Sequence, residues 1–113
     1  MAIPGFSHDY NKEELGMAAH NEVSLGDTYF VSPTFLFRWE ESQNAHVLLY
    51  PEGIVKLNDT GGAILKCCNG ETTVEEIIDE LEALYQADRD AITEGVIKFL
   101  EVSHAKGWIR IAS

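Results

Sequence analysis

The hydrophobic positions between residues 34 and 57 form three short runs that are rich in aromatic and β-branched residues. Runs of this kind, bounded by polar or turn-forming residues, are typical of β-strands. We expect strands over 34–39, 46–50 and 54–57. Pro51 and Gly53 mark a tight turn between the second and the third, because Pro fixes φ and Gly accepts either sign of φ. Such short links predict a three-stranded antiparallel meander.

The spacing of apolar residues becomes helical after residue 57. The polar residues 58–60 are all favoured N-caps for a first helix, which we expect to end at Gly70 in a left-handed conformation. Thr73 and Glu76 fit a capping box at the start of a second helix. Two helices in direct succession to the meander are therefore predicted.

A third helix is expected to begin after Asp88 and to stop at Gly107. Its apolar stripe consists of positions spaced for one helix face, namely Ile92, Val96, Phe99, Leu100 and Ser103. Residues 108–111 form a short apolar tail that should pack back on the body. The predicted fold class is α+β, with the meander followed by three helices in a winged helix-turn-helix-like form. Residues 32–113 make up this domain, and residues 1–31 are expected to be a mobile N-terminal extension.

The chain is acidic, with a net charge of -11 from 19 Asp and Glu against 8 Lys and Arg. Affinity for nucleic acid depends on Lys and Arg that neutralise phosphates, so this charge argues against a nucleic-acid partner. The same repulsion disfavours an anionic membrane surface, and no apolar run approaches the length of a membrane span. The first seven residues lack the pattern of a secretory signal. We therefore expect a cytoplasmic protein without nucleic-acid or membrane partners.

The sequence contains no recognised catalytic or metal-binding motif. The four histidines are dispersed at positions 8, 20, 46 and 104, and Cys67 and Cys68 are adjacent rather than spaced as metal ligands. Both cysteines are expected to be small apolar residues in or beside the core. Gly61 and Gly62 lack the remainder of a P-loop and are expected to allow close helix packing instead. We expect no enzyme activity, no metal and no cofactor.

Three stretches of the chain stand out together: Arg38-Trp39-Glu40 followed by Gln43, the nine-residue run VLLYPEGIV at 47–55, and the segment VKLN at 55–58. In combination they resemble the PqqD family. Gly70 and Gly107-Trp108 also fall where that family has its helix-ending turns. The resemblance covers roughly residues 32 to 110, and the run of nine residues is its most specific part.

The resemblance implies a peptide chaperone of pyrroloquinoline quinone biosynthesis. Members of the family bind a ribosomally made precursor peptide as an added strand. They present it to a radical S-adenosylmethionine enzyme, which joins a Glu to a Tyr within the peptide. They belong to a wider group of recognition domains with a winged helix-turn-helix form. The expected partners are therefore the precursor peptide and this enzyme.

The third predicted strand has an open edge unless a helix covers it, and an open edge is a template for another extended chain. With the resemblance, this edge predicts two sets of peptide-binding residues: Ile54, Val55, Lys56, Leu57 and Asn58 on the strand, and Val96, Phe99, Leu100 and Ser103 on the third helix. Core packing is the competing explanation for the helix residues. Lys56 either contacts a carboxylate of the peptide or discourages aggregation. The backbone groups of alternate strand residues serve opposite neighbours, and the pattern does not say which pair faces the peptide.

Two other functions are compatible with the same predicted fold. A winged-helix transcription regulator would need cations on its third helix, where Arg89, Lys98 and Lys106 are outnumbered by carboxylates. A scaffold that touches only the enzyme, with the peptide bound elsewhere, is the other candidate. The open edge and the N-terminal extension each allow a monomer or a homodimer.

Overall fold

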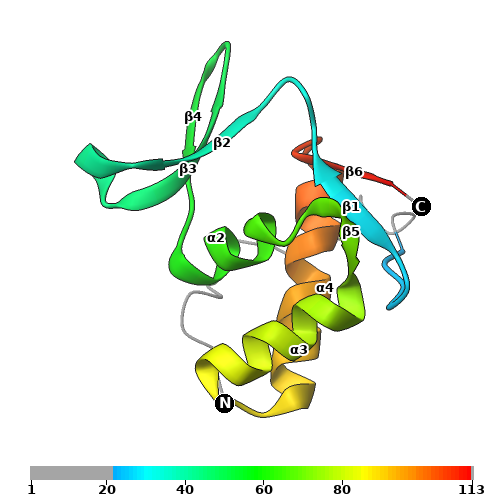
Figure 1. Cartoon of the computed structure of the whole chain (residues 1–113). Helices are drawn as coiled ribbons and strands as arrows, with labels where there is room; N and C mark the ends of the chain where they lie inside the picture. Colours follow the sequence, from blue (N-terminus) through cyan, green and yellow to red (C-terminus); the bar gives the residue numbers. More distant parts are fainter. Residues whose placement is uncertain (1–21, 113) are drawn as a thin grey trace.

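The computed structural model describes residues 22–112, which form two small antiparallel sheets and three α-helices (Figure 1). The fold class is α+β, as predicted. Their order is β1 (Thr28–Val31), β2 (Leu36–Glu40), β3 (Ala45–Tyr50), β4 (Gly53–Lys56), α2 (Asp59–Lys66), β5 (Asn69–Thr73), α3 (Val74–Tyr85), α4 (Arg89–Ala105) and β6 (Ile109–Ile111). A single 3-10 turn, Glu41–Gln43, lies between β2 and β3.

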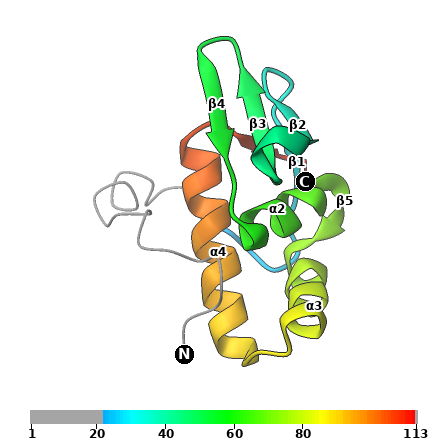
Figure 2. The same cartoon turned by 90° about the vertical axis from the view of Figure 1, so that its left-hand side faces the viewer.

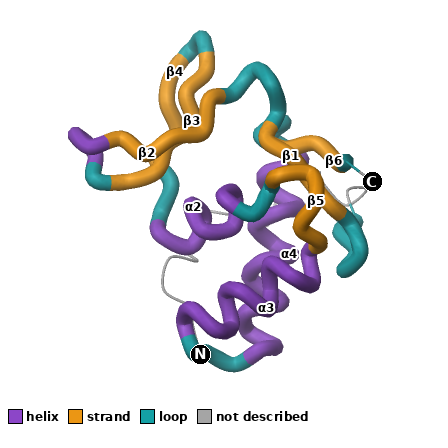
Figure 3. The backbone as a smooth tube through the Cα atoms, viewed as in Figure 1, coloured by secondary structure: helices purple, strands orange, loops and turns teal. Residues whose placement is uncertain are grey.

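The predicted meander is confirmed as the sheet β2–β3–β4, in that spatial order. β3 is the central strand and pairs antiparallel with both neighbours, Leu49 lying opposite Leu36 on one side and Ile54 on the other. Each strand lies within two residues of its predicted range. Figure 3 shows this sheet as a separate unit above the helices, joined to α2 through the end of β4.

The predicted N-caps are confirmed at all three helices. The side chain of Asn58 accepts a hydrogen bond from the backbone N–H of Gly61 at 2.8 Å, and Asp88 accepts one from Ala91 at 3.2 Å. Thr73 begins α3 through a complete capping box with its third helical residue. These caps satisfy backbone donors that a helix start leaves without partners.

The end of the first helix differs from the prediction. α2 stops at Lys66 with Cys67 as its C-cap, three residues before Gly70. Gly70 has the expected positive φ of +84°, but it lies inside β5. Gly107, at the end of α4, has a φ of +80° as predicted.

The segment before Ser32 is not an extension throughout, which corrects the expected domain boundary. β1 is the central strand of a second sheet in the order β5–β1–β6, and its Tyr29 is only 1% exposed. The predicted tail packs back by pairing with β1, with Val31 opposite Ile109. The folded domain therefore includes residues 28–31, and residues 1–21 lie outside the described part of the chain.

The core lies between the two sheets and the three helices, and the paired glycines of α2 let these layers approach closely. A β-carbon at Gly61 would lie 2.9 Å from the ring of Phe99 on α4, and one at Gly62 would lie 2.9 Å from Nδ1 of His46 on β3. The predicted packing role of the pair is confirmed. None of the helices within residues 22–112 combines the length and apolar character that a bilayer span requires.

Candidate functional site

β4 forms one edge of its sheet, because within residues 22–112 it pairs with β3 and with no other strand. Figure 2 shows β4 above α4, and Figure 1 shows it apart from the sheet that contains β1. An edge strand of this kind presents a row of backbone N–H and C=O groups to any extended chain beside it.

One hydrogen bond determines which residues of β4 present those groups. The N–H of Leu57 donates to the carbonyl of His46 at 3.0 Å, so Leu57 and His46 face each other as a hydrogen-bonded pair. In an antiparallel ladder such pairs alternate with non-bonded ones. By the register of β3 and β4, Val55 therefore also points its backbone groups at β3. The backbone groups of Ile54 and Lys56 point outward, to the open edge.

The side chains of β4 divide between solvent and core. Ile54 is 50% exposed and Lys56 is exposed, whereas Leu57 is only 6% exposed and belongs to the core. Val55 is half-buried and packs against the core from its margin. Asn58 lies past the strand and caps α2. The outward backbone groups and the exposed side chains thus belong to the same two residues, Ile54 and Lys56.

Residues 45–109 match the family model described as "Coenzyme PQQ synthesis protein D (PqqD)". The chain belongs to the PqqD family. The match runs from the central strand of the meander to β6 and so contains the whole of β4, α2, α3 and α4.

Relatives within the PqqD family extend the likeness beyond this segment. The chain is 42% identical over 91 residues to the "PqqA binding protein" of Azotobacter vinelandii, covering 80% of this chain and 98% of that protein. It is 46% identical over 88 residues to the protein of the same name from Pseudomonas aeruginosa PAO1, covering 78% and 95%.

A solution structure of a PqqD-family domain from Methylobacterium extorquens is similar to this fold. It is a truncation of PqqCD described as a functional, stand-alone recognition element for ribosomally synthesized and post-translationally modified peptides. The TM-score is 0.66 at 31% sequence identity, covering 78% of this chain and 94% of that one.

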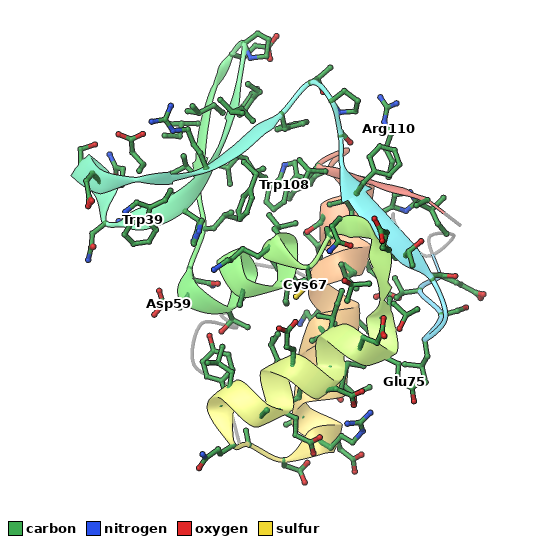
Figure 4. The ribbon with its side chains drawn as sticks, in the orientation of Figure 1. Trp39, Asp59, Cys67, Glu75, Trp108 and Arg110 are labelled. Atoms are coloured by element: carbon green, nitrogen blue, oxygen red, sulfur yellow. The ribbon has the colours of Figure 1, made fainter. Side chains whose placement is uncertain are left out.

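The four predicted binding residues on the third helix, α4, lie in the hydrophobic core of this domain. Each is at most 1% exposed: Val96, Phe99, Leu100 and Ser103. In this arrangement a peptide on the surface reaches none of them, so their contact with a peptide stays a prediction that requires α4 to move. The partly exposed aromatic residue at this end of α4 is Trp108, whose ring lies 6.5 Å from that of Phe99 (Figure 4). The sequence pattern assigned Trp108 only to the apolar tail.

A groove lies between α2 and α3, apart from the β4 edge. Its volume is about 410 Å³, and it is lined by Ala63, Lys66, Cys67, Glu80, Leu81, Ala83 and Leu84. The Cys67 thiol donates to Glu80 Oε2 at 3.0 Å. Burial, followed by this carboxylate, raises the pKa of Cys67 to about 12, so the thiol is protonated at neutral pH and is a poor nucleophile. Residues 22–112 bring together no group of three His, Cys, Asp or Glu suited to a metal ion.

Proposed function

We propose that this chain binds the ribosomally made precursor peptide of pyrroloquinoline quinone as an added strand along β4. The chain then presents the peptide, in the cytoplasm, to the radical S-adenosylmethionine enzyme that joins its Glu to its Tyr. The observation that carries the proposal is the open edge of β4, with the backbone groups of Ile54 and Lys56 directed outward. The names of the relatives, PqqA binding proteins, support the identity of the peptide.

Strand addition suits a chaperone because main-chain hydrogen bonds supply affinity while the side chains on either face supply specificity. β4 has a short exposed edge that ends where Leu57 enters the core. A bound peptide therefore gains a few backbone bonds and stays accessible beyond them. The section of peptide that extends past β4 is available to an enzyme.

On this proposal the chain contributes binding and no chemistry. The description of the related Methylobacterium extorquens domain as a recognition element supports this assignment. An exposed acidic surface along α3 is separate from β4 and offers a place for the enzyme to dock while the peptide is held.

The regulator alternative is disfavoured by the charges around α4. Arg89, at its start, donates to Asp79 at 2.9 Å and to Glu82 at 2.8 Å. A guanidinium that is paired with two carboxylates is not available to a phosphate without breaking those contacts. With a net charge of -11, the chain as a whole repels nucleic acid.

The test is an NMR titration of the ¹⁵N-labelled full chain with the precursor peptide at low and high salt. We expect shifts concentrated on β4 and its flanks, and a slowed amide exchange at Ile54 and Lys56, whose N–H groups would become bonded. Shifts spread only over α3, or none at all, would contradict strand addition. Sedimentation in the same samples tells whether the chain is a monomer or a homodimer and whether the peptide competes for the edge.

A further inference from the structure

The outer face of the β2–β3–β4 sheet carries two cross-strand rows of different chemistry. The first row is apolar and consists of Leu36, Leu49 and Ile54, which are directly opposite one another. The second row is Arg38, Val47 and Lys56. The opposite face carries Phe37, Leu48 and Val55, which pack on the core. Val47, on the central strand of this face, is fully buried, whereas the side chains of Ile54 and Lys56, at the edge of the face, are exposed.

Both rows end at the open edge of β4 in a side chain that is exposed to solvent. Leu36 is 55% exposed and Ile54 is 50% exposed, so the apolar row meets solvent at both ends. In the second row Arg38 lies 3.6 Å from Glu40, whereas Lys56 has no ion-pair partner among residues 22–112. Among residues 22–112, Lys56 is thus a cation without an ion-pair partner, in a chain whose net charge is -11.

We infer that the outer face of the sheet reads a short motif in the bound peptide, an Asp or Glu followed two residues later by an apolar residue. The inference rests on the proposed function, because it specifies which peptide fits the β4 edge. The peptide strand runs antiparallel to β4, its apolar residue lies opposite Ile54, and its carboxylate lies opposite Lys56.

The register follows from the geometry of β4. Ile54 and Lys56 each form a non-bonded pair with β3, so each forms a hydrogen-bonded pair with a strand on the other side. Residues directly opposite in an antiparallel pair place their side chains on the same face and interact. The chain direction of β4 runs from Ile54 to Lys56. In an antiparallel peptide, the residue nearer the N-terminus of the motif therefore lies opposite Lys56, and the residue two positions later lies opposite Ile54. The residue between the two motif positions points to the inner face, beside Val55.

Charge makes the acidic position selective. A carboxylate opposite Lys56 meets an ammonium that has no ion-pair partner among residues 22–112, in a chain that has only 8 Lys and Arg against 19 Asp and Glu. An apolar residue opposite Ile54 extends the row of Leu36 and Leu49 to four strands and removes the exposed flank of Ile54 from water. The two positions together fix the register of a peptide that main-chain bonds alone would let slide.

The test uses the full chain, the labelled precursor peptide, and charge reversal on both sides. Lys56→Glu should weaken binding about five- to tenfold at low salt, and the loss should shrink at high salt. Lys66→Glu, an exposed position on α2 with the same change in net charge, should change affinity less than about twofold. In a set of peptides with each carboxylate replaced in turn by Lys, one should bind Lys56→Glu better than the wild-type chain.

The peptide residue whose replacement by Lys compensates for Lys56→Glu then identifies the expected apolar residue, which lies two positions later in the peptide. Replacing this apolar residue by Ser should weaken binding to the wild-type chain, with little added loss on Ile54→Ser. A nitroxide on the N-terminus of the peptide should broaden amide signals at the Lys56 end of β4, as an antiparallel strand requires.

Each failure has a distinct meaning. If the peptide binds the wild-type chain and no charge reversal compensates for Lys56→Glu, the motif is wrong and the proposed function stands. The motif is also wrong if the compensating position is not followed two residues later by an apolar residue. If the precursor peptide does not bind the wild-type chain, both the motif and the proposed function fail.

Discussion

Gly61 lies so close to Phe99 that a β-carbon at position 61 would be 2.9 Å from Cε1 of the phenylalanine ring. Phe99 is 1% exposed and enclosed by the core, so its ring cannot move aside freely. We expect Gly61→Ala to lower the free energy of unfolding by about 1–3 kcal/mol, despite the higher helix propensity of Ala. Urea denaturation measures the change.

Gly26→Ala is the matched control, because nothing lies within 4 Å of a β-carbon at that position. Its free energy of unfolding should stay within about 0.5 kcal/mol of the wild-type value. Equal effects of the two substitutions would show that the contact between α2 and α4 does not limit stability.

Proline substitutions on β4 should separate binding from folding. The N–H of Ile54 faces the open edge, so Ile54→Pro should leave the fold intact and lower peptide affinity by removing a donor. The N–H of Val55 faces β3, so Val55→Pro should break the ladder and destabilise the sheet by about 3 kcal/mol. Thermal unfolding and peptide titration of both variants provide the test. The opposite outcomes would mean that the backbone groups of Val55, and not those of Ile54, face the open edge.

Two buried serines should respond oppositely to removal of the hydroxyl. Ser103 is fully buried, and its Oγ has no hydrogen-bond partner within residues 22–112, so Ser103→Ala should leave stability unchanged or raise it by up to about 1 kcal/mol. Ser32 Oγ donates to the carbonyl of Gly107 at 2.7 Å. Ser32→Ala should therefore cost about 1–2 kcal/mol. A large loss in Ser103→Ala, measured by urea denaturation, would reveal a role for its hydroxyl.

The stability of the sheet should depend on pH through His46. Burial, and then repulsion by Lys66, lower the pKa of His46 below its ordinary value of 6.5. The folded chain therefore binds fewer protons than the unfolded chain just below pH 6.5. This contribution to stability is complete above pH 6.5 and is lost as the pH falls toward the lowered pKa.

The imidazole signals of His46 measure this pKa directly by NMR. Lys66→Gln removes the repulsion and should raise the pKa of His46 toward 6.5. The ring of Trp39 lies 5.1 Å from the imidazole and should report the same transition in its chemical shifts. A titration midpoint above 6.5 would contradict the expected direction.

Local chemistry made most of this fold predictable from the sequence. The side chains of Asn58, Thr73 and Asp88 each cap a helix by bonding within three residues of themselves, so their sequence neighbours contain the whole signal. The meander could also be predicted, because its strands are joined by short turns and its three apolar runs are rich in aromatic and β-branched residues.

The second sheet was missed because its signal is not local. β5 has the sequence NGETT, which is polar and contains a glycine, and it becomes a strand by pairing with β1, where Thr28 lies opposite Thr73. For a related reason, the sequence did not decide whether the apolar stripe of α4 is buried in the core or exposed as a binding surface. This stripe fits both a core and a binding surface, and only the packing of Phe99 against Gly61 shows that this part belongs to the core.

The pairing of Tyr29 with Ile111 has a consequence for how the protein is made. β1 is among the first parts of the described chain to leave the ribosome, and β6 is among the last. During synthesis β1 can pair with β5 but must wait for β6, and long-range pairings of this kind slow folding. Until β6 has paired with β1, the chain exposes a second open strand edge, on β1, in addition to the edge of β4.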